Sequence, residues 1–405
     1  MTSRTLAVLG AALVVLALLA LYGQRSEGPP PQNDQLLLPE LEAALADVNR
    51  VSVVAAGGEP AATLERRDDR WAVAEKDGYP ADVVKLRETL VGLAEARIVE
   101  QKTANPEYYE RLGVEPVESE DAGGVAVTAH AGDAGFPAVI VGDAAGGGYQ
   151  YVRRADEATS YLVDRELDVP RSAAEWVDPS IVDIRGTRVA RITIEHPDGE
   201  TVSIFKDDEE QTNFTVENLP EGRELQYAGV ANVIGNSLRE LRLEDVEAAD
   251  SVADEDPEPV RTTFRTFDGL IVTVTAFERD DGAWISLEAG VDEGARSTAE
   301  VEAGDRSGER ETSGEAGDTF ETGDPAGDAA ESPDEGAGAS ASTDQASVAA
   351  ESAAATDRED EALDPRAEAE IINERTGGWR YKIPSYQFDQ MTRRMEDLLA
   401  AQDSE

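Results

Sequence analysis

Histidine and cysteine, which commonly carry catalysis or bind metals, are scarce in this chain. His130 and His196 are its only histidines, and it contains no cysteine. We find no second metal ligand at helical or hairpin spacing from either histidine, so we expect each to be an ordinary strand or turn residue. A Ser-His-Asp hydrolase would need one of them as its base, and no Gly-x-Ser-x-Gly motif occurs. Because such triads are recognised by geometry, the sequence disfavours this class without excluding it.

Three further patterns resemble ligand sites without meeting their requirements. Gly146-Gly147-Gly148 lies between two expected strands and lacks the Lys-Ser/Thr pair and the helix of a phosphate-binding loop. The acidic runs 207–210 and 254–256 lack the alternating Asp/Asn pattern of a calcium loop. We interpret the first as a hairpin loop and the others as solvated turns. With 85 acidic residues, no pair of carboxylates can be singled out for glycoside hydrolysis. The sequence thus predicts no catalytic, cofactor-binding or metal-binding residue.

The four tryptophans could stack on sugars or belong to a core. They are Trp71, Trp176, Trp284 and Trp379. Trp71 and Trp379 take the same place in a recurring pattern, where an aromatic ring would close the contact between a strand ladder and a helix. We therefore expect core packing rather than sugar binding.

That recurring pattern consists of an aromatic strand end, an apolar-Pro step and an amphipathic helix. It occurs over residues 71–96, more loosely over 214–241, and again over 379–398. In the first and last copies the apolar helix positions step by 3, 4 and 3 residues, the spacing of one helix face. The sequence thus predicts an α+β fold that repeats a unit of antiparallel β-meander plus amphipathic helix.

The N-terminus contains a candidate membrane segment. Residues 6–22 form a run of 17 residues without a charge, at the short end of the roughly 17 to 25 that a spanning helix needs. Because the run ends without a small-x-small cleavage pattern or a cysteine for lipid attachment, we favour an uncleaved signal-anchor over a cleaved signal peptide. The flanking charges are nearly balanced, and little chain precedes the run. We expect a single-pass protein of the cytoplasmic (inner) membrane whose bulk is periplasmic.

The chain is strongly acidic, with 85 Asp and Glu against 36 Lys and Arg and a net charge of −49. Such a surface repels nucleic acid and anionic lipid headgroups, which argues against nucleic-acid binding. Part of the acidity lies in residues 293–365, where 21 acidic residues face 4 arginines and aromatic residues are nearly missing. This composition predicts a disordered insert. Lysine is also scarce, which fits either adaptation to a salty exterior or a generally acidic proteome.

Strand and turn signals suggest how the chain is organised. We expect an N-terminal membrane anchor at 1–25, a linker at 26–45, an α+β module with a second meander at 46–180, a second module at 181–250, and a third at 260–405 interrupted by the acidic insert at 293–365. An insert of this length is tolerable because the entropy of loop closure grows only logarithmically with length.

Several stretches resemble the domain-of-unknown-function 4340 family. They are Trp71 to Asp82, Thr103 to Gly113, Tyr151 to Arg154, Tyr161 to Val163 and Trp379 to Leu399. The resemblance implies a bacterial protein with one N-terminal span, often encoded beside an ABC transporter and an auxiliary protein of the gliding-motility type. The family has no established catalytic residues to carry over. The acidic insert departs from its usual pattern and leaves the boundary of the third module open.

On this basis we expect a non-enzymatic, membrane-anchored accessory or binding component of an ABC-type envelope transport assembly. Its partner would be a permease or an auxiliary membrane subunit. An envelope hydrolase acting on glycan or peptide is the alternative, disfavoured by the poverty of His, Cys and nucleophile motifs. A passive structural spacer is the third possibility.

Overall fold

The computed structural model describes residues 35–132, 134–251, 257–292 and 364–401. Most of its elements are antiparallel strands, accompanied by a few helices, which confirms the expected α+β class at this level. No helix within the described ranges is long and apolar enough to cross a membrane. The expected anchor at 1–25 and nearly all of the acidic insert at 293–365 lie outside the described residues.

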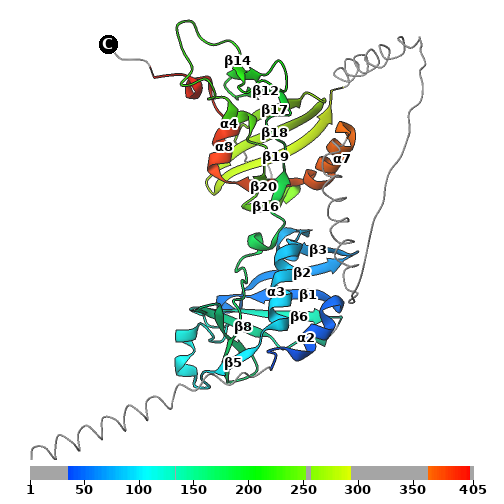
Figure 1. Ribbon diagram of the computed structural model, residues 1–405, viewed down its shortest axis with the longest axis vertical. Helices are drawn as coiled ribbons and strands as arrows, with labels where there is room; N and C mark the ends of the chain where they lie inside the picture. The colour runs from blue at the N-terminus through cyan, green and yellow to red at the C-terminus, as the bar shows by residue number, and fades with distance from the viewer. Residues whose placement is uncertain (1–34, 133, 252–256, 293–363, 402–405) are drawn as a thin grey trace, which may run out of the picture.

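The N-terminal half forms one ten-stranded antiparallel sheet, the lower lobe in Figure 1. Its order is β4-β3-β2-β1-β6-β8-β9-β10-β5, with β7 paired to β6. The strands are β1 (Val48–Val54), β2 (Pro60–Arg67), β3 (Arg70–Val73), β4 (Tyr79–Pro80), β5 (Ile98–Gln101), β6 (Val125–Ala131), β7 (Ala134–Gly135), β8 (Val139–Gly146), β9 (Tyr149–Arg154) and β10 (Ser160–Val163). The two expected meanders are therefore one sheet, since β1 pairs with β6 as well as with β2.

The upper lobe is built on an eight-stranded antiparallel sheet (Figure 1). Its order is β14-β13-β12-β17-β18-β19-β20-β16. The strands are β12 (Val189–Glu195), β13 (Thr201–Phe205), β14 (Thr215–Val216), β16 (Asp245–Ala248), β17 (Val260–Thr266), β18 (Leu270–Arg279), β19 (Gly282–Val291) and β20 (Trp379–Ile383). Between the lobes, β11 (Ser180–Val182) pairs with β15 (Leu241–Arg242). The expected second and third modules share this sheet, because β12 pairs with β17, so the boundary expected at 250–260 is corrected.

The two sheets have the same topology. With the two-residue strands β4 and β7 set aside, each takes its eight strands in the order 3-2-1-5-6-7-8-4, counted along its own stretch of chain. The register between the first and fifth strands also shifts at matching places, Val48/Arg50 and Val189/Arg191. We call residues 48–178 the first unit and residues 189–400 the second unit.

Both units also close in the same way after the eighth strand. Each ends in a short 3-10 helix, η6 (Ala173–Trp176) or η8 (Met395–Leu398). The amide of Asp82 donates to the carbonyl of Trp176 at 2.8 Å, and the amide of Gln226 donates to that of Leu398 at 3.0 Å. The hydrogen bonds therefore match the topology.

The repeat is thus two larger units rather than three small ones. Trp71 on β3 corresponds to Phe214 beside β14, as the pattern predicted. Trp379, however, begins β20, an eighth strand whose counterpart in the first unit begins near Tyr161. The local pattern recurs because a helix follows the strand in both cases, α3 (Val83–Glu95) after Trp71 and α8 (Ser385–Met391) after Trp379. The two strands nevertheless hold different positions in their sheets.

The helices of the described residues include two that the sequence did not predict, and most of the others are shorter than expected. They are α2 (Pro39–Ala44), α3 (Val83–Glu95), α4 (Asn232–Gly235), α7 (Pro365–Thr376) and α8 (Ser385–Met391). Only α3 matches its predicted span, with Asp82 capping its first turn and Leu86, Leu90 and Leu93 buried. In α4, a Cβ on Gly235 would lie 2.2 Å from the ring of Phe214, so the close packing there requires glycine.

The last predicted helix is broken between α8 and η8. The carboxylate of Glu200 accepts a hydrogen bond from the amide of Met395 at 2.9 Å, and Arg394 pairs with Asp198 at 2.8 Å. These contacts hold the chain in a turn where the apolar spacing alone predicted continuous helix.

The linker expected at 26–45 ends earlier than its predicted boundary. Residues before 35 lie outside the described part, but Leu36 forms a β-bridge with Arg97, and Leu37 and Leu41 are fully buried. The apolar Leu36-Leu37-Leu38 run explains the difference, because burying it against the first sheet removes it from water.

Candidate functional site

The two histidines lie in different units and do not converge. His130 is on β6, where its Nδ1 lies 3.4 Å from Nη2 of Arg50, and burial together with Arg50 lowers the pKa of the imidazole. His196 is in the β12–β13 hairpin, with Nε2 3.3 Å from the carbonyl of Arg393. Throughout the described ranges, no three His, Asp or Glu side chains are grouped so that they could hold a metal ion.

The glycine-rich run and the acidic run 207–210 form loops. Gly146, Gly147 and Gly148 occupy the β8–β9 hairpin with positive φ angles of 78°, 68° and 83°. Such angles suit glycine and a hairpin turn. The acidic run 207–210 is exposed, whereas the run 254–256 lies outside the described residues.

Lys206 has a buried amine, a feature that some catalytic lysines share. It is 7% exposed, and burial lowers its pKa. Its Nζ donates to the carbonyl of Gly186 at 3.2 Å and lies 4.6 Å from the centroid of the Phe214 ring. In the first unit the corresponding Arg66 donates to the carbonyl of Ala46. Each cation thus binds the backbone of the segment that precedes the first strand of its unit, β12 or β1, which is a structural role.

The tryptophans contribute to packing, as the sequence suggested, but not all in the same way. Trp176 is fully buried and its Nε1 donates to the carbonyl of Pro170 at 3.2 Å. Trp284 is 3% exposed, while Trp71 and Trp379 are partly buried against the core. Trp379 has a further contact, because it lies where the two units meet.

An aromatic junction joins the units. It consists of Tyr79 from the first unit and Trp379 and Tyr381 from the second. The Tyr79 ring meets Trp379 edge-on at 5.0 Å between centroids and Tyr381 at 6.1 Å. Both tyrosines are at most 1% exposed, and burial raises the pKa of each phenol. They therefore stay uncharged at physiological pH, and their rings pack the junction.

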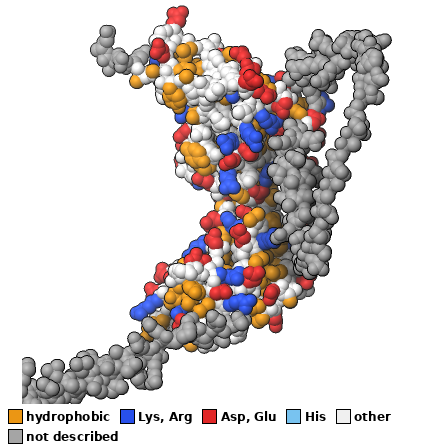
Figure 2. Space-filling model, viewed as in Figure 1, with side chains coloured by type: hydrophobic (Ala, Val, Ile, Leu, Met, Phe, Trp, Pro, Cys, Tyr) orange, Lys and Arg blue, Asp and Glu red, His pale blue; other side chains and the backbone are white. Residues whose placement is uncertain are grey.

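Ion pairs flank this junction. Lys76 of the first unit pairs with Asp245 of the second, and Asp178 pairs with Arg375 at 2.5 Å. Each pair is partly exposed, so we assign it about 0 to 1 kcal/mol and a role in orientation. Figure 2 shows the junction as a narrow waist between two broader lobes, with acidic and basic side chains around it.

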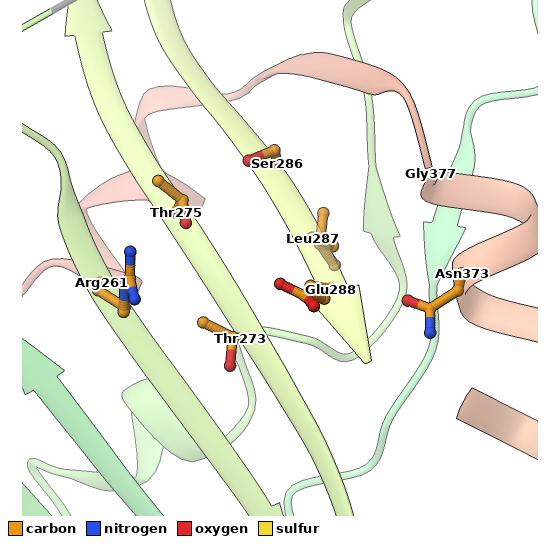
Figure 3. Close-up of a pocket in the computed structure, with 8 residues that line it drawn as sticks. All are labelled: Arg261, Thr273, Thr275, Ser286, Leu287, Glu288, Asn373 and Gly377. Atoms are coloured by element: carbon orange, nitrogen blue, oxygen red, sulfur yellow. The ribbon is translucent and has the colours of Figure 1, made fainter. Parts of the chain in front are cut away.

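The candidate binding surface is a hollow of about 460 Å³ on the outer face of the second sheet, which we call the outer pocket (Figure 3). Its lining residues are Arg261, Thr273, Thr275, Ser286, Leu287, Glu288, Asn373 and Gly377. Adjacent strands β17, β18 and β19 provide all but the last two, which come from the end of α7. A cation, a carboxylate, hydroxyls and an amide thus share one open surface, which can bind a polar group.

Strand register places these side chains in rows. Arg261 lies opposite Thr275, which lies opposite Ser286, and in the next row Thr273 lies opposite Glu288. Residues that face each other across neighbouring strands have side chains on the same face. Sequence reasoning missed this surface because two of its lining residues, Asn373 and Gly377, lie far along the chain from the strands that carry the others.

Asn373 gives the outer pocket a fixed rim. Its Oδ1 accepts a hydrogen bond from the Ala289 amide and its Nδ2 donates to the Ala289 carbonyl, both at 2.8 Å. The side chain thereby occupies backbone groups at an edge of β19 that β20 does not reach, since β20 pairs only with residues 283–285. Covering an exposed strand edge in this way prevents pairing with other chains.

Two other hollows are less polar. One of about 520 Å³ lies beside α3 and is lined in part by Val84 and Val91, and one of about 250 Å³ lies beside α2 and Phe136. The first exposes Val84 at 68%. Neither gathers as many polar groups as the outer pocket.

Comparison with known proteins agrees with the resemblance seen in the sequence. The model of a family described as a domain of unknown function (DUF4340) matches residues 71–262, from β3 of the first unit to β17 of the second. No curated protein and no solved structure matches the chain.

Proposed function

Since residues 71–262 belong to the DUF4340 family, we propose that this chain is a non-enzymatic accessory or binding component of an ABC-type envelope transport assembly. It is held in the inner membrane by the uncharged run at 6–22, and its two units stand outside the cytoplasm. The partner is a transporter permease or an auxiliary membrane subunit.

The observation that carries this proposal is the family match, supported by the joining of the two units. Tyr79, Trp379 and Tyr381 bury an aromatic contact between units that share one topology. We interpret the units as copies of one ancestral α+β module. Two sheets joined by a buried aromatic contact suit a component that positions or binds others.

Affinity purification of the full-length protein from its native membranes tests the proposal. We expect permease or auxiliary subunits of one ABC transporter to co-purify in mild detergent. A matched control replaces residues 1–25 with a cleaved signal peptide and should lose most of this association. Recovery without any transporter subunit, or fractionation of the wild-type protein into the cytosol, would contradict the proposal.

A hydrolase assay separates the rival class. We expect purified protein to leave envelope glycan and peptide substrates intact. Turnover that survives stringent purification and disappears when a carboxylate of the outer pocket, Glu288, is changed to Gln would favour the hydrolase instead.

A further inference from the structure

The shared topology allows the outer faces of the two sheets to be compared position by position. In the second unit, Arg261, Thr275 and Ser286 form one row across β17, β18 and β19. In the first unit, the corresponding row across β6, β8 and β9 is Ala126, Ile140 and Arg153. The shared strand order makes these rows equivalent. In the numbering used above, β6, β8 and β9 are the fifth, sixth and seventh strands of the first sheet, and β17, β18 and β19 are the same strands of the second.

In the first unit this row is covered by the chain itself. The covering segment, residues 102–124, buries Tyr109, Val114 and Val117 in a small cluster with Ala126 and Ile140. Nε of Arg153 donates to the carbonyl of Val114 at 2.8 Å, and its guanidinium lies 4.8 Å from the centroid of the Tyr109 ring. The first unit thus shows how this face receives a stretch of polypeptide.

The second unit has a shorter connection at the same place. Twenty-three residues join β5 to β6, whereas eleven join β16 to β17. The equivalent row is polar throughout, whereas the first-unit row combines the apolar Ala126 and Ile140 with Arg153, and with its neighbours it lines the open outer pocket. A polar row does not need an apolar cover, so its occupant must offer hydrogen bonds and charge.

Charge indicates which occupant fits. Glu288 in the outer pocket and Glu195, opposite Arg261, are both exposed. Within the part of the chain that the structure describes, neither carboxylate is in an ion pair, nor is Arg261. Among the lining residues one acid accompanies one cation, Glu195 adds a second acid on the neighbouring strand, and the whole chain carries −49, so a basic segment is attracted and an acidic one is repelled.

We propose that the outer pocket binds a basic peptide segment of a partner protein, laid across β17 to β19 as residues 102–124 lie across the first sheet. A backbone carbonyl of the segment accepts from Arg261, a hydrogen bond of the same kind as that of Arg153 but made from the fifth strand instead of the seventh, and a Lys or Arg pairs with Glu288. The hydroxyls of Thr273, Thr275 and Ser286 bind its backbone. This inference rests on the proposed function, and the partner is a subunit of the transport assembly.

Photo-crosslinking in native membranes tests the proposal. A benzoylphenylalanine at Thr275 of the full-length protein should form an adduct with one segment of a partner, identified by mass spectrometry, that contains Lys or Arg. The same probe at Thr128, on the outer face of the first sheet, should not capture that segment. A synthetic peptide of the captured segment should bind the purified protein, and Glu288→Lys should weaken binding at least tenfold. Asp280→Lys, an equal charge change at the β18–β19 turn, should change it less than twofold.

Several results would overturn the inference. They are the absence of an adduct at Thr275, an adduct only with residues 293–363 or with a second copy of this chain, capture of the same segment at Thr128, and peptide binding that is indifferent to Glu288→Lys. If transporter subunits co-purify while any of these holds, the binding surface is wrong and the proposed function stands. If no subunit co-purifies, the proposed function itself fails.

Discussion

Individual aromatic side chains determine where the two units meet. Tyr79 belongs to the first unit, but its side chain contacts the second. It is almost completely buried because its ring packs against the rings of Trp379 and Tyr381. An aromatic contact of this kind adds about 0.5 to 1.5 kcal/mol to the burial of the rings themselves. The junction should therefore depend on this one side chain more than on the ion pairs around it.

We predict that Tyr79→Ala lowers the free energy of unfolding by about 3 to 5 kcal/mol, because it removes a buried ring and leaves a cavity. Urea denaturation monitored by tryptophan fluorescence measures the loss. Tyr386→Ala is the control, since Tyr386 is 61% exposed, and it should change stability by about 0.5 kcal/mol or less. Equal losses for the two variants would mean that Tyr79 is not held as described.

His130 should make stability sensitive to mild acid. Burial and Arg50 hold the pKa of its imidazole below the usual value in the folded protein. As the pH falls below about 6.5, the unfolded chain takes up the proton first, so folding weakens until the folded-state pKa is passed. Between pH 7.5 and 5.5 the wild type should lose more stability than His130→Gln in urea titrations. Identical losses would show that this histidine is not shielded.

At the scale of elements, a single side chain can bind backbone groups of a strand that no neighbouring strand pairs with. Asn373 of α7 takes the place of a neighbouring strand along part of β19. It thus links the helix to the sheet and fixes the rim of the outer pocket.

We predict that Asn373→Ala costs about 1 to 3 kcal/mol, because the amide and carbonyl of Ala289 lose their partner. Hydrogen exchange at Ala289 should accelerate while exchange in β12 and β13 is unchanged. Glu374→Ala, at the adjacent exposed position of α7, provides the control. Unchanged exchange at Ala289 in Asn373→Ala would contradict the edge-capping role.

The positions of individual strands and helices were easier to predict than the pairing between strands that are distant in the sequence. The Asp268-Gly269 turn between apolar alternating runs marks the β17–β18 hairpin, and Asp82 before a helical apolar pattern marks the start of α3. The pairing of β1 with β6 and of β12 with β17 brings together distant segments, and alternation within one strand carries no information about it. That pairing creates the two units, which therefore escaped sequence reasoning. The rows of the outer pocket lie on consecutive strands, and what the sequence does not reveal is that Asn373 and Gly377 complete the lining from a distant part of the chain. The same limit explains why the sequence pattern places Trp379 on the wrong strand of the repeat.

At the scale of the whole molecule, the two sheets stay in contact although the chain is strongly acidic and its negative charges repel one another. A net charge of −49 repels itself, and salt screens such repulsion beyond about 10 Å at 0.1 M ionic strength. If the composition is an adaptation to a salty exterior, the thermal midpoint should rise between dilute buffer and molar KCl. Calorimetry across this range decides the point, and a midpoint that does not rise would remove the adaptation.

The central feature of the molecule is that its two units are held as one body through the aromatic junction. Because the sequence contains no cysteine, Glu88→Cys on α3 and Glu370→Cys on α7 allow two spin labels to be placed, one in each unit. Pulsed electron paramagnetic resonance between these labels should give one narrow distance distribution, which Tyr79→Ala broadens. A broad or multiple distribution in the otherwise unaltered protein would contradict the account.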